Sequence, residues 1–100
     1  YWGNNLEPAK EERIPLVRDR WICLEHMIQV NDIGQDNGEL AAWIDGKLYI
    51  HYQGFRWRSN QDVRLKRFDI GVYVHNAEKD NTVWYDDVVL STGYVGPVKK

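Results

Sequence analysis

The sequence is poor in several residue types and patterns, and each deficit excludes something. Its 100 residues include one cysteine, Cys23, which excludes an internal disulfide bond and leaves the redox compartment open. No apolar run reaches the roughly 18 to 20 residues of a membrane-spanning helix, and no basic and then apolar signal segment opens the chain. The formal charge of -2 argues against nucleic-acid binding through bulk electrostatics. We therefore expect neither a membrane nor a nucleic-acid partner.

Aromatic residues are the type that the sequence has in excess, with five Trp and six Tyr. Such an excess suits a sheet protein, and it also suits a surface that stacks on flat ligands such as sugar rings. The length fits one small domain with one core. We therefore expect residues 1–100 to form a single domain.

Alternating apolar and polar residues predict an all-β protein of five or six strands joined by turns. Residues 1–20 are an irregular lead-in, and the strands lie within residues 21–97. Asp45-Gly46 between two alternating runs predicts a tight hairpin turn, and Gly54 predicts a bulge in the second strand. The pattern is typical of an antiparallel β-sandwich or barrel. The predicted strands cover residues 21–30, 39–44, 47–53 (continued by 55–58), 65–75 and 82–91.

The same alternation assigns each side chain of a strand to one face of the sheet. In the first strand Ile22, Leu24, His26, Ile28 and Val30 are predicted to face the core. If the strands are neighbours, the outward side chains line one groove. These outward side chains include Glu25, Gln29, Trp43, Asp69, Tyr73 and His75.

Several short motifs follow one another within residues 14–97. They are Trp21-Ile-Cys-Leu-Glu25 followed by Asn31, Asn37-Gly38-Glu39, Trp43-Ile-Asp-Gly46, Trp84-Tyr-Asp-Asp-Val88 and Ser91-Thr-Gly-Tyr-Val-Gly-Pro97. Their order and spacing resemble the C-terminal half of concanavalin A-like jelly rolls, and more narrowly the polysaccharide-lyase-like and laminin-G-like proteins that act on or bind polysaccharides. The resemblance implies two curved antiparallel sheets packed face to face, with a glycan groove on the concave face of one.

The resemblance also implies a polysaccharide partner and a secreted or extracytoplasmic location. A complete fold of this kind has more strands than the sequence predicts here. The chain is therefore expected to be the C-terminal part of a larger domain that lacks its N-terminal half, a minimal sandwich, or a homodimer that shares strands.

Two kinds of chemistry fit the outward side chains. β-Elimination in a uronate polymer needs a base for the C5 proton and an acid for the leaving oxygen, roles that suit Tyr73 and His75. It also needs a group that holds the carboxylate, for which Arg56, Arg58 or Gln29 is a candidate. Glycoside hydrolysis needs two carboxylates, and Glu25 and Asp69 are the pair on one predicted face.

Each candidate residue also has a purely structural interpretation. In this interpretation Tyr73 and His75 are exposed side chains at a strand end with no catalytic role, and Glu25 forms an ion pair with an arginine. Trp43 and Trp57 are sugar-stacking platforms or ordinary sheet packing.

Two sets of residues in the sequence are candidates for metal binding. His26, His51 and His75 lie outside any local ligand motif, and alternation places His26 and His75 on opposite sides, which argues against a shared transition metal. Calcium suits the hard oxygens of Asp86 and Asp87. The resemblance implies a structural calcium ion where Asp86 meets the N-terminal segment, with Glu7 as the proposed partner. Residues 32–39 fail the EF-hand pattern and are interpreted as a plain turn.

These observations favour a carbohydrate-binding module whose aromatic outer face contacts a polysaccharide. The alternative is a polysaccharide lyase that uses Tyr73 and His75. A third interpretation is a structural or assembly domain whose aromatic side chains are buried at an interface.

Overall fold

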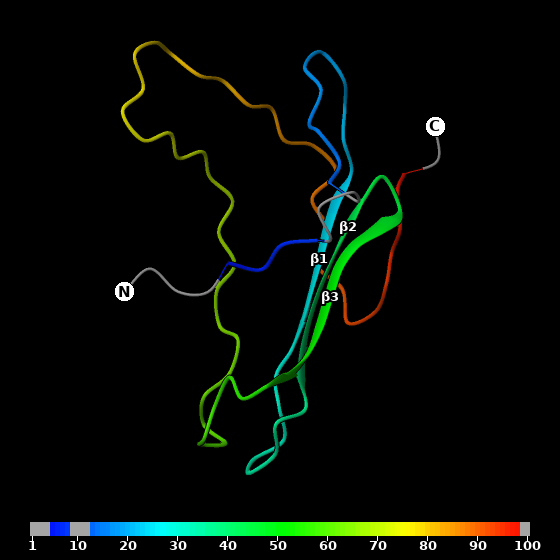
Figure 1. The fold of residues 1–100 in the computed structure, drawn as a ribbon, viewed down its shortest axis with the longest axis vertical. Coiled ribbons are helices and arrows are strands. Elements are labelled where there is room, and N and C mark those ends of the chain that lie inside the picture. Colours follow the sequence, from blue (N-terminus) through cyan, green and yellow to red (C-terminus); the bar gives the residue numbers. More distant parts are fainter. Residues whose placement is uncertain (1–4, 9–12, 99–100) are drawn as a thin grey trace. The chain divides into compact units, whose positions relative to one another are not determined.

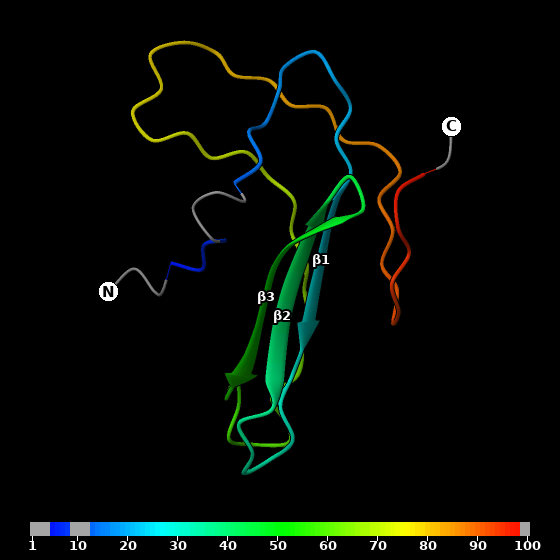
Figure 2. The same ribbon diagram turned by 45° about the vertical axis from the view of Figure 1, so that its right-hand side comes forward.

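The computed structural model describes residues 5–8 and 13–98, and its regular structure is one antiparallel sheet (Figure 1). The strands are β1 (Leu24–Gln29), β2 (Gly38–Ile44) and β3 (Lys47–Phe55), in the order β1-β2-β3. Figure 2 shows the three strands running side by side. The described residues contain no helix, so none could cross a membrane. The predicted all-β antiparallel class is confirmed.

The β2–β3 hairpin closes at the predicted turn. Asp45 and Gly46 have φ angles of 50° and 79°, the left-handed values that a two-residue connection of this kind requires. The Asp45 side chain also ties the turn to the start of β1: its Oδ1 accepts a hydrogen bond from the Cys23 amide at 2.9 Å, and its Oδ2 lies 2.9 Å from the Arg20 guanidinium. The turn therefore fixes three segments at once.

Strand β3 contains two bulges. Gly38 pairs with Phe55 while Glu39 pairs with Gln53, so Gly54, with a φ of 84°, is the extra residue at one end. This is the bulge predicted from the sequence. The second is not predicted: Ala42 pairs with Ile50 while Trp43 pairs with Leu48, which leaves Tyr49 unopposed. Bulges bend a strand and re-aim its side chains.

The loop before β2 is anchored by a fully buried asparagine. Asn31 has no exposed surface, its Oδ1 accepts from the Arg58 amide at 3.0 Å, and its Nδ2 donates to the Arg58 carbonyl at 3.0 Å. Farther along the loop, Asp32 and Asn37 form reciprocal hydrogen bonds of 2.8 Å. The predicted plain turn is therefore held by its own side chains, as asparagine and aspartate favour.

The apolar core of the sheet is small and lies on β2. Ala41, Ala42 and Ile44 are the buried hydrophobic residues of the described chain. The predicted core-facing side of β1 is wrong in part: Leu24 is 56% exposed and Ile28 is 48% exposed. His26 on the same face is also exposed. The reason is that the described residues form one sheet, so no second strand layer covers this face.

The chain divides into two compact units. The first comprises the described residues up to Arg64 together with those from Gly96 onward, and it contains the whole sheet. The second, Leu65–Val95, contains no strand, so the strands predicted at residues 65–75 and 82–91 are not formed. At Asp87 the chain has a φ of 51°, and the Asp87 amide donates a hydrogen bond of 2.8 Å to Oδ1 of the neighbouring Asp86. Such local bonding competes with a strand ladder.

Candidate functional site

One face of the sheet carries most of the predicted binding residues of the first unit. Directly opposed residues share a face in an antiparallel sheet, so the register defines three rows across the strands. We call this surface the polar face. Its rows are Glu25, Trp43 and Leu48; then Met27, Ala41 and His51; then Gln29, Glu39 and Gln53. The structure therefore brings the candidates Glu25, Gln29 and Trp43 onto one face, as alternation predicts.

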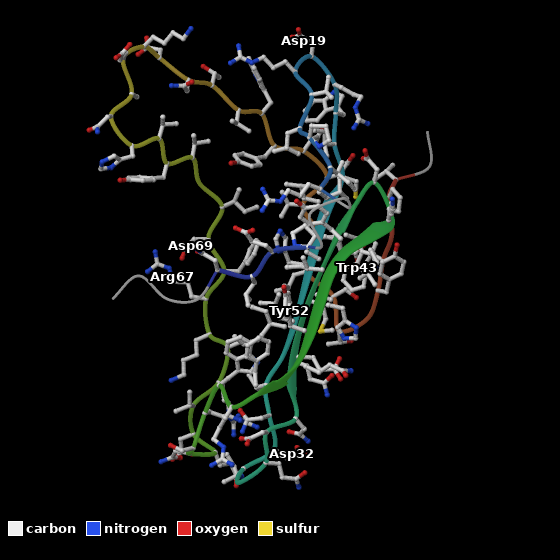
Figure 3. The ribbon with its side chains drawn as sticks, viewed as in Figure 1. Asp19, Asp32, Trp43, Tyr52, Arg67 and Asp69 are labelled. Atoms are coloured by element: carbon white, nitrogen blue, oxygen red, sulfur yellow. The ribbon has the colours of Figure 1, made fainter. Side chains whose placement is uncertain are left out.

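The two ends of the polar face differ in chemistry. At one end Trp43 of β2, which is labelled in Figure 3, lies between Glu25 and the exposed Leu48. At the other end Glu39 Oε2 lies 3.1 Å from His51 Nε2, and Gln53 Nε2 donates to Glu39 Oε1 at 3.2 Å. The face therefore combines an aromatic end with a hydrogen-bonding end.

Sequence reasoning missed this group of Glu39, His51 and Gln53. His51 and Gln53 are two residues apart on β3 and therefore share a face, a signal that the alternation does contain. Their partner Glu39 could be found only from the register of the hairpin, and the bulge at Tyr49 shifts that register by one residue.

Glu25 at the aromatic end is held by the backbone. Its Oε1 accepts a hydrogen bond of 3.2 Å from the Gly96 amide, so the carboxylate is fixed beside the C-terminal part of the first unit. Burial raises the pKa of the neighbouring Cys23 thiol, and the negative charges of Glu25 and Asp45 raise it further. Cys23 is therefore held as a thiol and is a poor nucleophile, since the thiolate is the reactive form.

The candidates beyond the Gly54 bulge make structural contacts. Arg58 donates from Nε to the Asn31 carbonyl and from a terminal nitrogen to the Val63 carbonyl, each at 3.0 Å. Arg56 pairs with the exposed Asp36. Trp57 stacks on Phe55 with ring centroids 4.3 Å apart. Of these three candidates, Arg58 has its guanidinium directed at backbone carbonyls and so serves to close the loop.

The second unit contains the other predicted site residues as two side-chain pairs. The Tyr73 hydroxyl and His75 Nδ1 share a hydrogen bond of 2.8 Å, and Tyr73 is 82% exposed. Arg67 Nε lies 2.8 Å from Asp69 Oδ2, and Figure 3 shows these two side chains turned toward each other. Each pair is separated by two positions, which places its members on one side of an extended chain. The predicted constellation is thus distributed over two units rather than along one sheet.

The sequence model of a family described as polysaccharide lyase matches residues 2–89. The chain belongs to the polysaccharide lyase family. No curated protein and no solved structure matches the chain. Membership confirms the polysaccharide-lyase-like part of the predicted resemblance and connects this lyase-family chain with polysaccharides.

The candidate metal ligands lie in different parts of this polysaccharide lyase family member. The register places His26 and His51 on opposite faces of the sheet. Within the described ranges, no three side chains of the His, Cys, Asp or Glu type converge on a metal position. Asp86 and Asp87 therefore supply only part of a ligand set. Calcium at these residues stays a prediction, as does a contribution from Glu7.

Proposed function

We propose that this protein is a polysaccharide lyase that cleaves uronate polymers by β-elimination, with Tyr73 and His75 as its proton-transfer pair. The observation that carries the proposal is the 2.8 Å hydrogen bond between the Tyr73 hydroxyl and His75 Nδ1. Membership of the polysaccharide lyase family supports it. The exposure of Tyr73 leaves its hydroxyl open to a large substrate.

Through this hydrogen bond, a single proton transfer from Tyr73 to His75 produces both the base and the acid that elimination requires. Transfer of the phenolic proton to the imidazole gives a phenolate base and an imidazolium acid, the two groups that elimination requires. The phenolate takes the C5 proton, the electron pair forms the C4–C5 double bond, and the C4–O bond breaks. The imidazolium protonates the leaving oxygen, so turnover restores the neutral pair.

The substrate carboxylate beside C5 needs a cation to stabilise the developing negative charge. Arg67 is the one arginine of Leu65–Val95, and it contacts the carboxylate of Asp69. Because exposed ion pairs of this kind contribute little to stability, a substrate carboxylate can replace Asp69 at low cost. Six residues of extended chain separate Arg67 from Tyr73 and span about 20 Å. We therefore assign Arg67 to the carboxylate of a neighbouring uronate unit rather than to that of the unit that loses its C5 proton.

The test follows the ultraviolet absorbance of the unsaturated uronide during incubation with alginate, glucuronan, pectate and heparinoid polymers. We expect activity on at least one polymer and a loss of at least about 100-fold in kcat for Tyr73→Phe. Tyr85→Phe is the matched control, because its hydroxyl donates to the Gly71 carbonyl in the same unit. Absence of the unsaturated product from every polymer contradicts the lyase proposal, and full activity of Tyr73→Phe contradicts the role of this residue.

A second candidate is polysaccharide binding without cleavage. The supporting observation is that Trp43 lies opposite Glu25 on the face that also carries Gln29. A pyranose stacks its CH-rich side on an indole ring while its hydroxyls bond to polar neighbours. Affinity electrophoresis through the same polymers tests this, with Trp43→Ala expected to abolish retardation and Trp57→Ala to preserve it, because Trp57 stacks on Phe55.

The fold and location belong to the same proposal. We infer that the sheet is one layer of a concanavalin A-like jelly roll, since a single sheet leaves Leu24 and Ile28 exposed on the face opposite the polar one. A polymer substrate that does not enter cells also implies that the protein works outside the cytoplasm.

A further inference from the structure

We propose that Glu39, His51 and Gln53 form a sugar-binding subsite that recognises the hydroxyl groups of a pyranose unit within the polymer. The inference rests on the proposed polysaccharide function and adds a location and a chemical preference to it. The residues lie at the hydrogen-bonding end of the polar face, on the central strand β2 and on β3.

The geometry of the group is that of a prepared hydrogen-bonding site. Glu39 is in contact with His51 through one carboxylate oxygen and with Gln53 through the other. These contacts hold three side chains from two strands in fixed directions, which lowers the entropy lost on binding. The side chains of His51 and Glu39 are 39% and 29% exposed, so they remain accessible to a ligand.

The donors and acceptors that remain suit a sugar diol. Each carboxylate oxygen can accept a second hydrogen bond, and the Gln53 amide retains both a donor and an acceptor. Neighbouring hydroxyls of a sugar act as donor and acceptor together, so they can bond to the carboxylate and to the amide at once. Gln29 lies directly opposite Glu39 on β1 and adds another amide to the same row.

The charge of Glu39 also sets a preference. A carboxylate in the subsite repels a uronate carboxylate placed against it. The subsite is therefore expected to bind the hydroxyl edge of a unit and to direct the carboxylate of that unit away from the sheet. This orients the polymer as well as holding it.

The spacing along β2 connects the subsite with the aromatic end of the polar face. Glu39 and Trp43 are four residues apart on one strand, a separation of about 13 Å at about 3.3 Å per residue. Ala41 between them is the smallest side chain of the three, so the face has no bulky group on β2 between its two ends. A chain of sugars can thus stack on Trp43 and bond to Glu39.

The test compares polymer binding by Glu39→Ala and Gln53→Ala with binding by the wild-type chain, using affinity electrophoresis in alginate, glucuronan and a neutral glucan. We expect about tenfold weaker binding for Glu39→Ala, since a hydrogen bond to a charged group is lost, and a smaller loss for Gln53→Ala. The matched control is His26→Ala, an exposed histidine on the opposite face of the sheet, which should bind as the wild type does. Circular dichroism verifies the fold of each variant.

The outcomes separate this inference from the proposed function. Unchanged binding by both Glu39→Ala and Gln53→Ala overturns the subsite, whether or not the wild type produces unsaturated uronide. Equal weakening by His26→Ala also overturns it, because the effect is then not specific to the polar face. Binding that is lost only in the polar-face variants supports the subsite even if no polymer is cleaved.

Discussion

The β2–β3 hairpin and the segment Leu65–Val95 carry the same alternating pattern, yet only the hairpin forms strands. In the hairpin the partner strand is two residues away, and Asp45-Gly46 adopts the left-handed angles that close it. In the second segment the alternating runs at residues 65–75 and 82–91 are farther apart, and Asp87 interrupts the latter with a φ of 51°. Alternation thus determines which side chains lie on the same side of an extended chain. Pairing of two strands also requires a partner strand nearby in sequence and a turn that can connect them.

Hydrogen exchange should measure the largest difference between the two regions. Amides of β2 are bonded within a central strand, while the described amides of Leu65–Val95 take part in no ladder. We expect exchange in β2 to be slower by about a thousandfold, as core strands open only through near-global unfolding. Mass spectrometry of peptides from residues 38–44 and 65–75 gives the comparison. Strong protection of the latter peptide would restore the predicted strand there.

Asn31→Ala should cause the largest loss of stability among single substitutions. The change removes side-chain bonds to both backbone groups of Arg58 at a fully buried position. We expect a loss of about 3 kcal/mol in the free energy of unfolding, because a buried polar site is emptied and two partly buried backbone groups of Arg58 lose their partners. Urea denaturation followed by tryptophan fluorescence measures it. Asn81→Ala in the second unit removes an exposed contact to the Lys79 carbonyl and should change stability little.

Gly38→Ala should have a smaller effect, confined to the sheet. A Cβ at Gly38 would lie 2.6 Å from the Trp57 ring and 2.7 Å from the Phe55 carbonyl oxygen, and the backbone atom cannot move aside cheaply. We expect a loss of about 2 kcal/mol, as for other overpacked sites. Gly71→Ala is the control, since no atom lies within 4 Å of the added group. Equal midpoints for the two variants in thermal unfolding would contradict the packing around Trp57.

Asp45→Asn should have the smallest effect, visible mainly in the pH dependence. The Cys23 amide and then Arg20 lower the pKa of the Asp45 carboxyl below its ordinary value of 3.8. Because the folded pKa is depressed, the contribution is present above 3.8 and is lost as the pH falls through the lower folded value. The variant should therefore show a shallower loss of stability below pH 3.8. Asp69→Asn, from the exposed pair of the second unit, should leave the sheet unaffected.

Much of the first unit could be predicted from the sequence because its signals are local. The turn at Asp45-Gly46, the bulge at Gly54 and the shared face of Glu25 and Trp43 all follow from residue type and period. The exposed side of β1 could not be predicted, since exposure depends on a second layer and not on alternation. The Asn31–Arg58 contact joins residues that are 27 positions apart, and no periodic pattern reports such a separation.

The candidate site was predictable to a similar extent. Tyr73 and His75 are two positions apart, so their proximity follows from an extended chain alone. The group around Glu39 depends on the register of two strands, which the unpredicted bulge at Tyr49 resets. Local pairs can therefore be identified from sequence, whereas a group that spans strands needs every bulge to be placed first.

The two bulges of β3 also affect which edge of the sheet can pair with a strand from another molecule. Strand β3 is one edge of the sheet, and its ladder with β2 is irregular near both ends, at Tyr49 and at Gly54. Irregular edges are poor templates for adding a foreign strand. The opposite edge, β1, pairs with β2 in unbroken register. Self-association through backbone pairing, and the aggregation that follows from it, should therefore begin at β1.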